Sequence, residues 1–189
     1  MKKLQDLTKE EWNTHFPLEL VDHNPEWKNL YQKEKDLILN HIDEKSILRI
    51  EHFGSSSIPS IKSKPYIDII IEIPEVLLFD VHLISKFSEI GYTHFVVPKR
   101  NDIESYSSFG KGYNLENKKD QIFHIHMCPK DNIMWKQIEF RDYLIANKDR
   151  AKAYEKLKLD LISKYQNDRG AYVLGKTDFV FETLELVNR

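Results

Sequence analysis

The residues best suited to chemistry begin in a short polar loop, within the stretch "EHFGSSSIPSIKSKPYIDIIIE". A glycine there permits close approach of the backbone to a ligand, three serines supply hydroxyl and N–H groups, and a lysine adds a cation. Such a loop can hold a phosphate, and the alternative is a turn whose hydroxyls bond its own backbone. We predict a phosphate or nucleotide site formed by Gly54, Ser55, Ser56, Ser57 and Lys64.

The predicted strand after this loop carries two carboxylates. Asp68 and Glu72 share one face of it, because side chains alternate between the two faces along a strand. A carboxylate at the entry of an otherwise apolar strand needs a partner. We predict Asp68 as a catalytic residue and metal ligand, with Glu72 as a further ligand. The alternative is a carboxylate that caps the backbone or forms a salt bridge, with Lys64 or Arg100 as the partner.

A second strand, in "QIFHIHM", carries His124 and His126 on one face. Histidine is the commonest protein metal ligand. If this strand lies beside that of Asp68, the three side chains form a His-His-carboxylate site suited to metal-assisted phosphate chemistry. We therefore predict both histidines as catalytic residues and metal ligands. The alternative is that they are half-buried strand residues that donate to backbone carbonyls.

The elements that position these residues follow from the spacing of apolar residues. A lead-in helix within residues 1–20 begins at Thr8, with Glu11 completing a capping box. Residues 24–42 form an amphipathic helix with Asn24 as its cap. Strands are predicted at 47–53 and 66–73, a helix at 81–92, and an antiparallel hairpin over 93–129 that ends in the histidine strand.

From Asp131 onward the apolar period is helical. Three helices are predicted, over 131–147, 149–165 and 176–188, with Tyr154 on the core-facing stripe of the second. The expected fold class is α+β. It has a small mixed or antiparallel sheet with flanking helices up to about residue 130, followed by a helical C-terminal part over 131–189, all within one domain spanning 1–189.

Composition narrows the classes of partner. The chain has 28 Lys and Arg against 30 Asp and Glu, so its overall charge attracts neither nucleic acid nor a membrane surface. One cysteine, Cys128, excludes an internal disulfide and fits a reducing compartment. The first residues are basic without a following apolar segment. We expect a cytoplasmic protein.

Four motifs together resemble the GrpB family, a group of uncharacterised bacterial proteins. They are "IEHFGSSSIPSIKSKPYIDI", "FHIHMCP", "FRDYLIANKDRAKAYEKLK" and "YVLGKTDFV", and the likeness covers about residues 20–188 in the same order. That family is similar to the polymerase-β-like nucleotidyltransferase superfamily. The resemblance therefore implies a nucleotidyltransferase-like fold, in which a Gly-Ser loop binds a triphosphate and an Asp-x-Asp pair holds two Mg²⁺ ions.

The superfamily pattern is only partly present. Gly54 and Ser55 match the loop, and Asp68 matches the first carboxylate after a spacer of 12 residues. Position 70, where the second carboxylate is expected, is Ile. Since one carboxylate rarely holds such cations alone, either other side chains replace it or the activity has changed or been lost. The replacements considered are Glu72, Glu51, His124 and His126.

The resemblance also adds candidates outside the loop. Arg141 in "FRDY" and Lys176 before the last helix are predicted to bind phosphate, with ordinary ion pairing, for Arg141 to Asp142 or a glutamate, as the alternative. His52 is either a residue packed on the sheet or a ligand beside the loop.

Three hypotheses of function follow. The first is a metal-dependent nucleotidyltransferase-like protein that binds a nucleotide or phosphorylated small molecule, with Mg²⁺ or Mn²⁺ as the cofactor and Zn²⁺ as the alternative. The second is a metal-dependent phosphoesterase with a His-His-Asp site. The third is a catalytically degenerate domain that binds a ligand or a protein partner.

Overall fold

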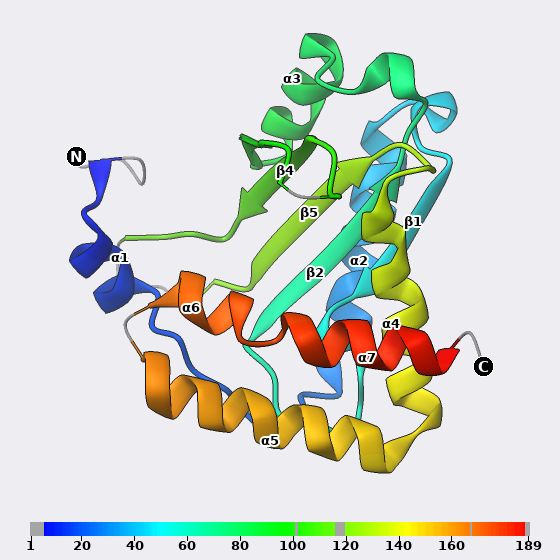
Figure 1. Ribbon diagram of the computed structural model, residues 1–189. Coiled ribbons are helices and arrows are strands. Elements are labelled where there is room, and N and C mark those ends of the chain that lie inside the picture. Colours follow the sequence, from blue (N-terminus) through cyan, green and yellow to red (C-terminus); the bar gives the residue numbers. More distant parts are fainter. Residues whose placement is uncertain (1–5, 101, 116–119, 167, 188–189) are drawn as a thin grey trace.

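A computed structural model of the chain describes residues 6–100, 102–115, 120–166 and 168–187. Its centre is a mixed sheet of five strands in the order β1-β2-β5-β4-β3 (Figure 1). The β2 and β5 strands run parallel, and the other neighbours pair antiparallel. The strands are β1 Arg49–Phe53, β2 Tyr66–Glu72, β3 Thr93–Val97, β4 Tyr106–Lys111 and β5 Ile122–Cys128.

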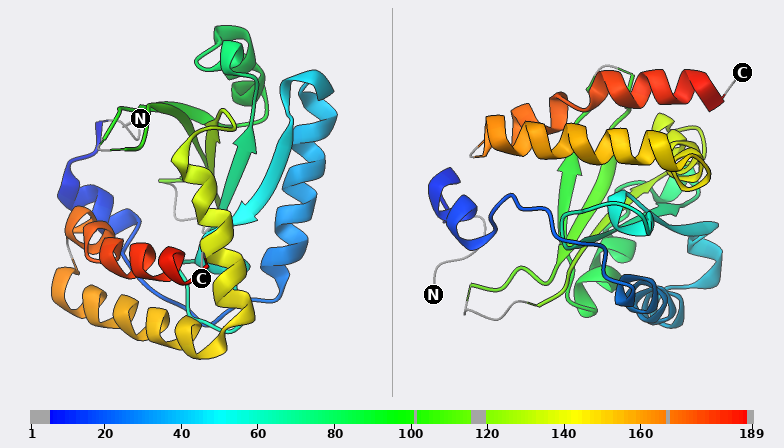
Figure 2. Two further views of the ribbon diagram at one scale, coloured as in Figure 1. Left: turned by 45° about the vertical axis from the view of Figure 1, so that its right-hand side comes forward. Right: turned by 90° about the horizontal axis from the view of Figure 1, so that it is seen from below.

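Helices cover both faces of this sheet (Figure 2). The α2 and α3 helices lie on one side, and the helices of the C-terminal part lie on the other (Figures 1 and 2). The helices are α1 Lys9–His15, α2 Glu26–His41, α3 Val81–Glu89, α4 Lys136–Ala146, α5 Lys148–Tyr165, α6 Arg169–Leu174 and α7 Thr177–Val187, with 3-10 turns at Glu44–Ser46, Ser55–Ser57, Glu75–Leu77 and Ile133–Trp135. The predicted α+β class, with a helical C-terminal part, is confirmed.

Local caps fix where the first helices begin. Thr8 and Glu11 form the predicted capping box at α1. The Asn24 side chain accepts a hydrogen bond from the Glu26 N–H at the start of α2. Each of these side chains satisfies an N–H group that the first helical turn leaves without a backbone partner.

The main hydrophobic core lies between the sheet and the α2 and α3 helices. On β2, Ile67, Ile69 and Ile71 are fully buried and face these helices, because alternate residues of a strand share a face. The helices contribute the buried side chains Trp27, Ile38, Leu83 and Phe87 to this core. The even-numbered residues of β2, including Asp68, therefore face the C-terminal helices.

Two differences from the predicted elements concern the second half of the chain. The hairpin region forms a meander of three strands, and part of its predicted polar turn, at 116–119, lies outside the described residues. A short helix, α6, precedes the last predicted helix. The Asp168 side chain caps α6 by accepting from the Ala171 N–H, although Gly170 lowers its helix propensity. This low helix propensity explains why the sequence pattern did not predict α6.

No helix in the described part of the chain is long and apolar enough to span a membrane.

The packing of α3 on the sheet gives a first testable prediction. Phe87 is fully buried in the main core, whereas Phe95 on the edge strand β3 is 46% exposed. Phe87→Ala removes a large buried side chain and should lower the unfolding free energy by about 3–5 kcal/mol. Phe95→Ala is the matched control and should change it by less than about 1 kcal/mol. Urea denaturation of both variants measures the difference, and equal effects would contradict this packing.

Candidate functional site

The site lies where β2 and β5 begin, on the sheet face that points toward the C-terminal helices. The parallel register pairs Asp68 with His124 and Ile70 with His126. The predicted adjacency of the aspartate and histidine strands is therefore present. Nδ1 of His124 is 3.4 Å from Oδ1 of Asp68, and both side chains are about a quarter exposed, at 26% and 22%.

His124 is held at both of its ring nitrogens. Nδ1 faces Asp68, and Nε2 is hydrogen-bonded with the Tyr113 hydroxyl. The Tyr113 ring also stacks on the imidazole, with ring centroids 5.5 Å apart. Asp68, His124 and Tyr113 thus form a continuous chain of groups that can each hold or pass a proton.

His126 occupies a less polar environment. Its Nδ1 is 3.2 Å from the Tyr106 hydroxyl, and the Phe53 ring packs edge-on against the imidazole. Burial, only partly offset by the negative charge of Asp68, lowers the pKa of His126 to about 4. The ring is therefore neutral at neutral pH.

Asp68 is ionised despite its burial. Desolvation alone would raise the pKa of its carboxyl, but the hydrogen bond and charge of His124, with the charges of Lys64 and His126, outweigh it and lower the pKa to about 2. A negative group is therefore present at this point of the sheet at neutral pH.

The glycine of the loop lies directly against this carboxylate. Gly54 has a φ of +71°, and a Cβ placed on it would lie 2.5 Å from Oδ2 of Asp68. Both the backbone conformation and the close approach exclude a side chain at this position. The predicted association of the loop with the strand aspartate is therefore a direct contact.

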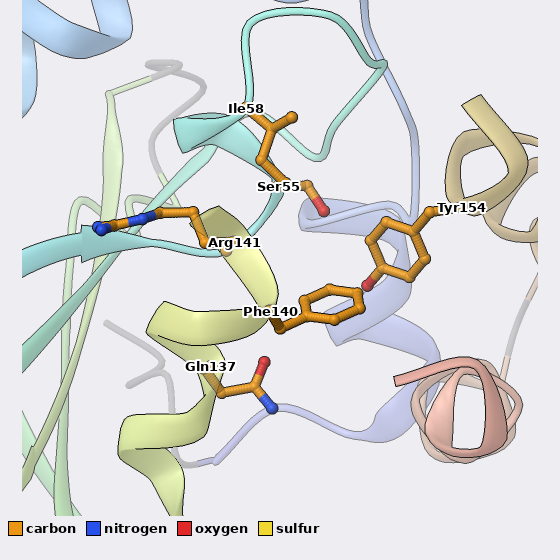
Figure 3. A pocket seen from close by; sticks show the side chains of 7 residues that line it. Ser55, Ile58, Gln137, Phe140, Arg141 and Tyr154 are labelled. Atoms are coloured by element: carbon orange, nitrogen blue, oxygen red, sulfur yellow. The ribbon is translucent and has the colours of Figure 1, made fainter. Parts of the chain in front are cut away.

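The three serines of the loop have different surroundings. Ser55 lines a small pocket together with Gly54, and it is hydrogen-bonded with the Tyr154 hydroxyl (Figure 3). The buried Ser56 hydroxyl is 3.0 Å from Nε2 of His52, and Ser57 donates to the Gly54 carbonyl at 2.6 Å. Ser55 is thus the loop hydroxyl that a pocket ligand can reach, while the others hold the loop in shape.

Arg141 borders the same pocket but is directed elsewhere. Figure 3 shows its guanidinium pointing away from Tyr154. Its Nη1 donates to the His52 carbonyl at 2.6 Å and pairs with Glu51 at 3.2 Å, while its Nε pairs with Asp142 at 2.7 Å. The guanidinium therefore fixes α4 to β1, which is the ion-pairing alternative considered for this residue.

The predicted lysines do converge on Asp68, and a further lysine joins them. Lys64 and Lys176 each interact electrostatically with Asp68, and burial lowers the pKa of both amines, that of Lys176 to about 8. Lys158 on α5 is 1% exposed and donates to the Lys62 carbonyl at 2.6 Å. Burial and the charge of Lys176 lower the pKa of Lys158 to about 7.

Three other candidates lie apart from this cluster. His52 is on the opposite face of the sheet, where its ring stacks on Tyr31 of α2 at 4.9 Å. Glu51 pairs with Arg49 and Arg141. Glu72 is four residues along β2 from Asp68, a separation of about 13 Å at the usual rise of a strand. The structure does not bring these side chains to Asp68.

The donor set does not fit the predicted metal centre. Among the described residues, no group of three or more His, Cys, Asp or Glu side chains could hold a metal ion. Both nitrogens of His124 are engaged, and Ile70, at the position of the second carboxylate, is buried among apolar side chains. The chain thus offers Asp68 without the further free oxygen ligands that Mg²⁺ or Mn²⁺ requires.

Comparison with known sequences identifies the family. The profile described as "GrpB protein" matches residues 17–186. The chain belongs to the GrpB family. It is 38% identical to the "Glutamate-rich protein GrpB" of Alkalihalophilus pseudofirmus over 167 residues, which cover 87% of this chain and 92% of that protein. It is 30% identical to the "UPF0157 protein YqkA" of Bacillus subtilis, where the match covers 86% of this chain and 45% of the relative.

A solved structure of the same family shares the fold of this GrpB-family chain. The "conserved protein GrpB" of Enterococcus faecalis superposes with a TM-score of 0.72 at 24% identity, covering 89% of this chain and 96% of that chain. A Cid1 poly(U) polymerase mutant bound to MgATP aligns with a TM-score of 0.42 at 12% identity, over 74% of this chain and 45% of that enzyme. The first likeness concerns the fold alone.

Three residues of the site were absent from the sequence predictions as functional groups. The sequence pattern predicts Tyr154 as a core residue, and it is buried, but its hydroxyl also meets Ser55 in the pocket. Lys158 lies four residues after Tyr154 on the same stripe of α5, so helical spacing already indicated a buried lysine there. Tyr113 follows a turn residue, Gly112, and no local pattern connects it with His124.

The contact between Gly54 and Asp68 gives a second prediction. Gly54→Ala forces a left-handed backbone onto alanine and drives its Cβ into the carboxylate. We expect a loss of about 1–3 kcal/mol in unfolding free energy. Gly170→Ala in α6, where φ is not positive, is the control and should change the value by less than about 1 kcal/mol. Urea denaturation measures both variants. A Gly54→Ala variant as stable as the wild type would contradict the contact.

The buried lysine gives a third prediction, on pH. The pKa of Lys158 is about 7 in the folded chain against 10.5 for an ordinary lysine, so only the unfolded state stays protonated between these values. The unfolding free energy of the wild type, relative to Lys158→Met, should therefore rise between pH 7 and 10.5, by at most about 1.4 kcal/mol per pH unit. Denaturation at several pH values measures it, and a flat difference would contradict the burial of a titrating amine.

Proposed function

We propose that this protein binds a nucleotide or another phosphorylated small molecule beside Asp68, and transfers a nucleotidyl group from it to a small acceptor. The observation that carries the proposal is a surplus of positive charge next to the glycine-serine loop. Three lysines gather there. Lys64 and Lys176 interact electrostatically with Asp68, and Lys158 interacts with both of these amines.

Buried positive charges without partners are unfavourable, and an anion offsets that cost. Within the described part of the chain, none of the three lysines forms an ion pair with a carboxylate, although each lies in the field of a nearby acid. A phosphate group supplies several acceptor oxygens and a charge of the required sign. The lysines therefore favour a phosphorylated ligand over a neutral or cationic one.

The loop supports the same ligand class. Gly54 leaves the backbone accessible beside Asp68, and Ser55 presents its hydroxyl to the pocket (Figure 3). Backbone N–H and hydroxyl groups of such turns are common donors to phosphate oxygens. The pocket thus offers polar donors from the loop on one side and the Tyr154 hydroxyl on the other.

The chain of Asp68, His124 and Tyr113 suits the proton transfer that a group transfer requires. An acceptor hydroxyl must lose its proton as it attacks phosphorus, and a positioned imidazole is the commonest side chain to take it. Asp68 fixes the orientation of His124 through Nδ1, and Tyr113 occupies Nε2. In this proposal the Tyr113 hydroxyl is the member of the chain that meets the acceptor.

The alternative hypotheses have less support. The phosphoesterase hypothesis needs both histidines and Asp68 as joint metal ligands, and the described residues do not form that set. A domain that binds a ligand without turning it over has the same pocket as the proposal, so an activity assay must separate the two.

A thermal-shift titration tests the binding step. ATP, CTP, GTP and inorganic pyrophosphate are added to the wild type with and without Mg²⁺ or Mn²⁺. A ligand at about 100 times its dissociation constant stabilises the fold by about 2.7 kcal/mol, which for a chain of this size raises the melting temperature by about 5–10 °C. Lys176→Met should reduce the shift, and Lys156→Met, which removes an exposed lysine on α5, should not.

The transfer step is tested next with the stabilising nucleotide and a panel of small acceptors. Release of pyrophosphate that depends on an acceptor supports nucleotidyl transfer. Release of inorganic phosphate alone supports hydrolysis instead, and binding without product supports a ligand-binding domain. If none of the probes shifts the wild type under any condition, the proposed function is wrong.

A further inference from the structure

The environment of Asp68 has lysines where a metal site would have further carboxylates, and this difference indicates the kind of ligand that the site binds. Resting on the proposed function, we propose that the site takes the phosphate groups of its ligand as the metal-free anion, with the lysine amines in place of bridging divalent cations. The proposal concerns Lys64, Lys158 and Lys176, and it departs from the two-metal scheme that the superfamily resemblance implies.

The carboxylates that would hold cations are missing. A two-ion site needs several oxygen ligands at one place, because Mg²⁺ prefers six oxygens with near-octahedral geometry. Asp68 is the one strand carboxylate at the site, and it faces His124. Ile70 stands at the position of the second carboxylate, and it is fully buried in an apolar cluster with Phe53 and Ile138.

Two lysines, Lys64 and Lys176, interact with that single carboxylate, and a third, Lys158, interacts with both of them. They come from three separate elements: Lys64 precedes β2, Lys158 lies on α5, and Lys176 precedes α7. Each lysine amine is held by an aromatic ring. The distances to the ring centroids are 4.9 Å from Lys64 to Tyr66, 4.9 Å from Lys158 to Tyr154, and 4.6 Å from Lys176 to Tyr172.

Lys158 differs from an ordinary surface lysine in its burial, whereas Lys64 and Lys176 are partly exposed. Lys158 is 1% exposed, and its one hydrogen bond among the described residues goes to the Lys62 carbonyl. The three amines are also close enough that Lys64 lowers the pKa of both Lys158 and Lys176. Amines this close repel one another and repel a divalent cation, and an anion bound among them relieves that repulsion.

The rings themselves are connected to the proton-carrying chain. Tyr66, over which Lys64 lies, packs edge-on against His124 at 5.4 Å. Tyr154, over which Lys158 lies, reaches Ser55 of the loop. A phosphate held by these amines therefore lies between the glycine-serine loop and the Asp68–His124 pair, as the proposed reaction requires.

The test measures binding with the metal content controlled. Wild-type protein and buffers are freed of divalent cations with a chelating resin, because soluble chelators are themselves polyanions. Isothermal titration with ATP and with inorganic pyrophosphate is then run in this buffer and again with excess Mg²⁺. We expect the two dissociation constants for each probe to differ by less than about tenfold.

Two charge-removing variants and one control complete the design. Lys176→Met and Lys64→Met keep most of the apolar stem and remove the amine, and each should weaken metal-free binding about tenfold or more. Both side chains are partly exposed, so these variants are expected to fold. Lys156→Met removes an exposed amine from the same helix as Lys158 and should leave the dissociation constant within about twofold.

The outcomes separate this inference from the function on which it rests. Binding that tightens tenfold or more with Mg²⁺ overturns the metal-free inference and leaves the proposed function standing. Metal-free binding that Lys176→Met and Lys64→Met do not weaken overturns the role of the lysines. If neither probe binds with or without Mg²⁺, both the inference and the proposed function are wrong.

Discussion

The parallel pairing of β2 with β5 is the constraint on which the site depends. Its register sets Asp68 beside His124 on the face that the C-terminal helices cover, and it places Ile67, Ile69 and Ile71 on the opposite face against α2 and α3. A shift of one residue in this register would exchange the two faces and bury the charged groups in the main core. Exposing the isoleucines of β2 to water is unfavourable, so they fix the register of the strand. The register in turn fixes the position of Asp68, which lies between two of them.

The loop before β2 is shaped by the same carboxylate. Gly54 approaches Asp68 so closely that a side chain is excluded, and the positive φ turns the following serines into a tight 3-10 turn. That turn directs Ser56 toward His52 on the far face and leaves Ser55 at the pocket. The loop is thus held from both sides of the sheet, and such preorganisation favours a ligand that needs donors at fixed positions.

The C-terminal helices complete the site as well as covering the sheet. Helix α5 brings Tyr154 and Lys158, and the segment between α6 and α7 brings Lys176. The resulting environment is rich in amines and poor in carboxylates, which is the reverse of a metal centre that must bind cations beside an anionic substrate. The helical part therefore supplies two of the three lysines, Lys158 and Lys176, while the sheet supplies the carboxylate of Asp68 and the imidazole of His124.

The sequence by itself determined the features that depend on local pattern. Apolar alternation gave the strands, Thr8 and Asn24 gave two helix starts, and the Gly-Ser loop before Asp68 was recognisable because its residues are close in the chain. Only the tertiary structure decided which groups meet. His52 lies two residues before Gly54 and Glu72 shares β2 with Asp68, yet both lie apart from Asp68, while Lys158 comes from a helix about ninety residues away. Register, face and the packing of distant helices fix these distances, and no short-range pattern in the chain encodes them.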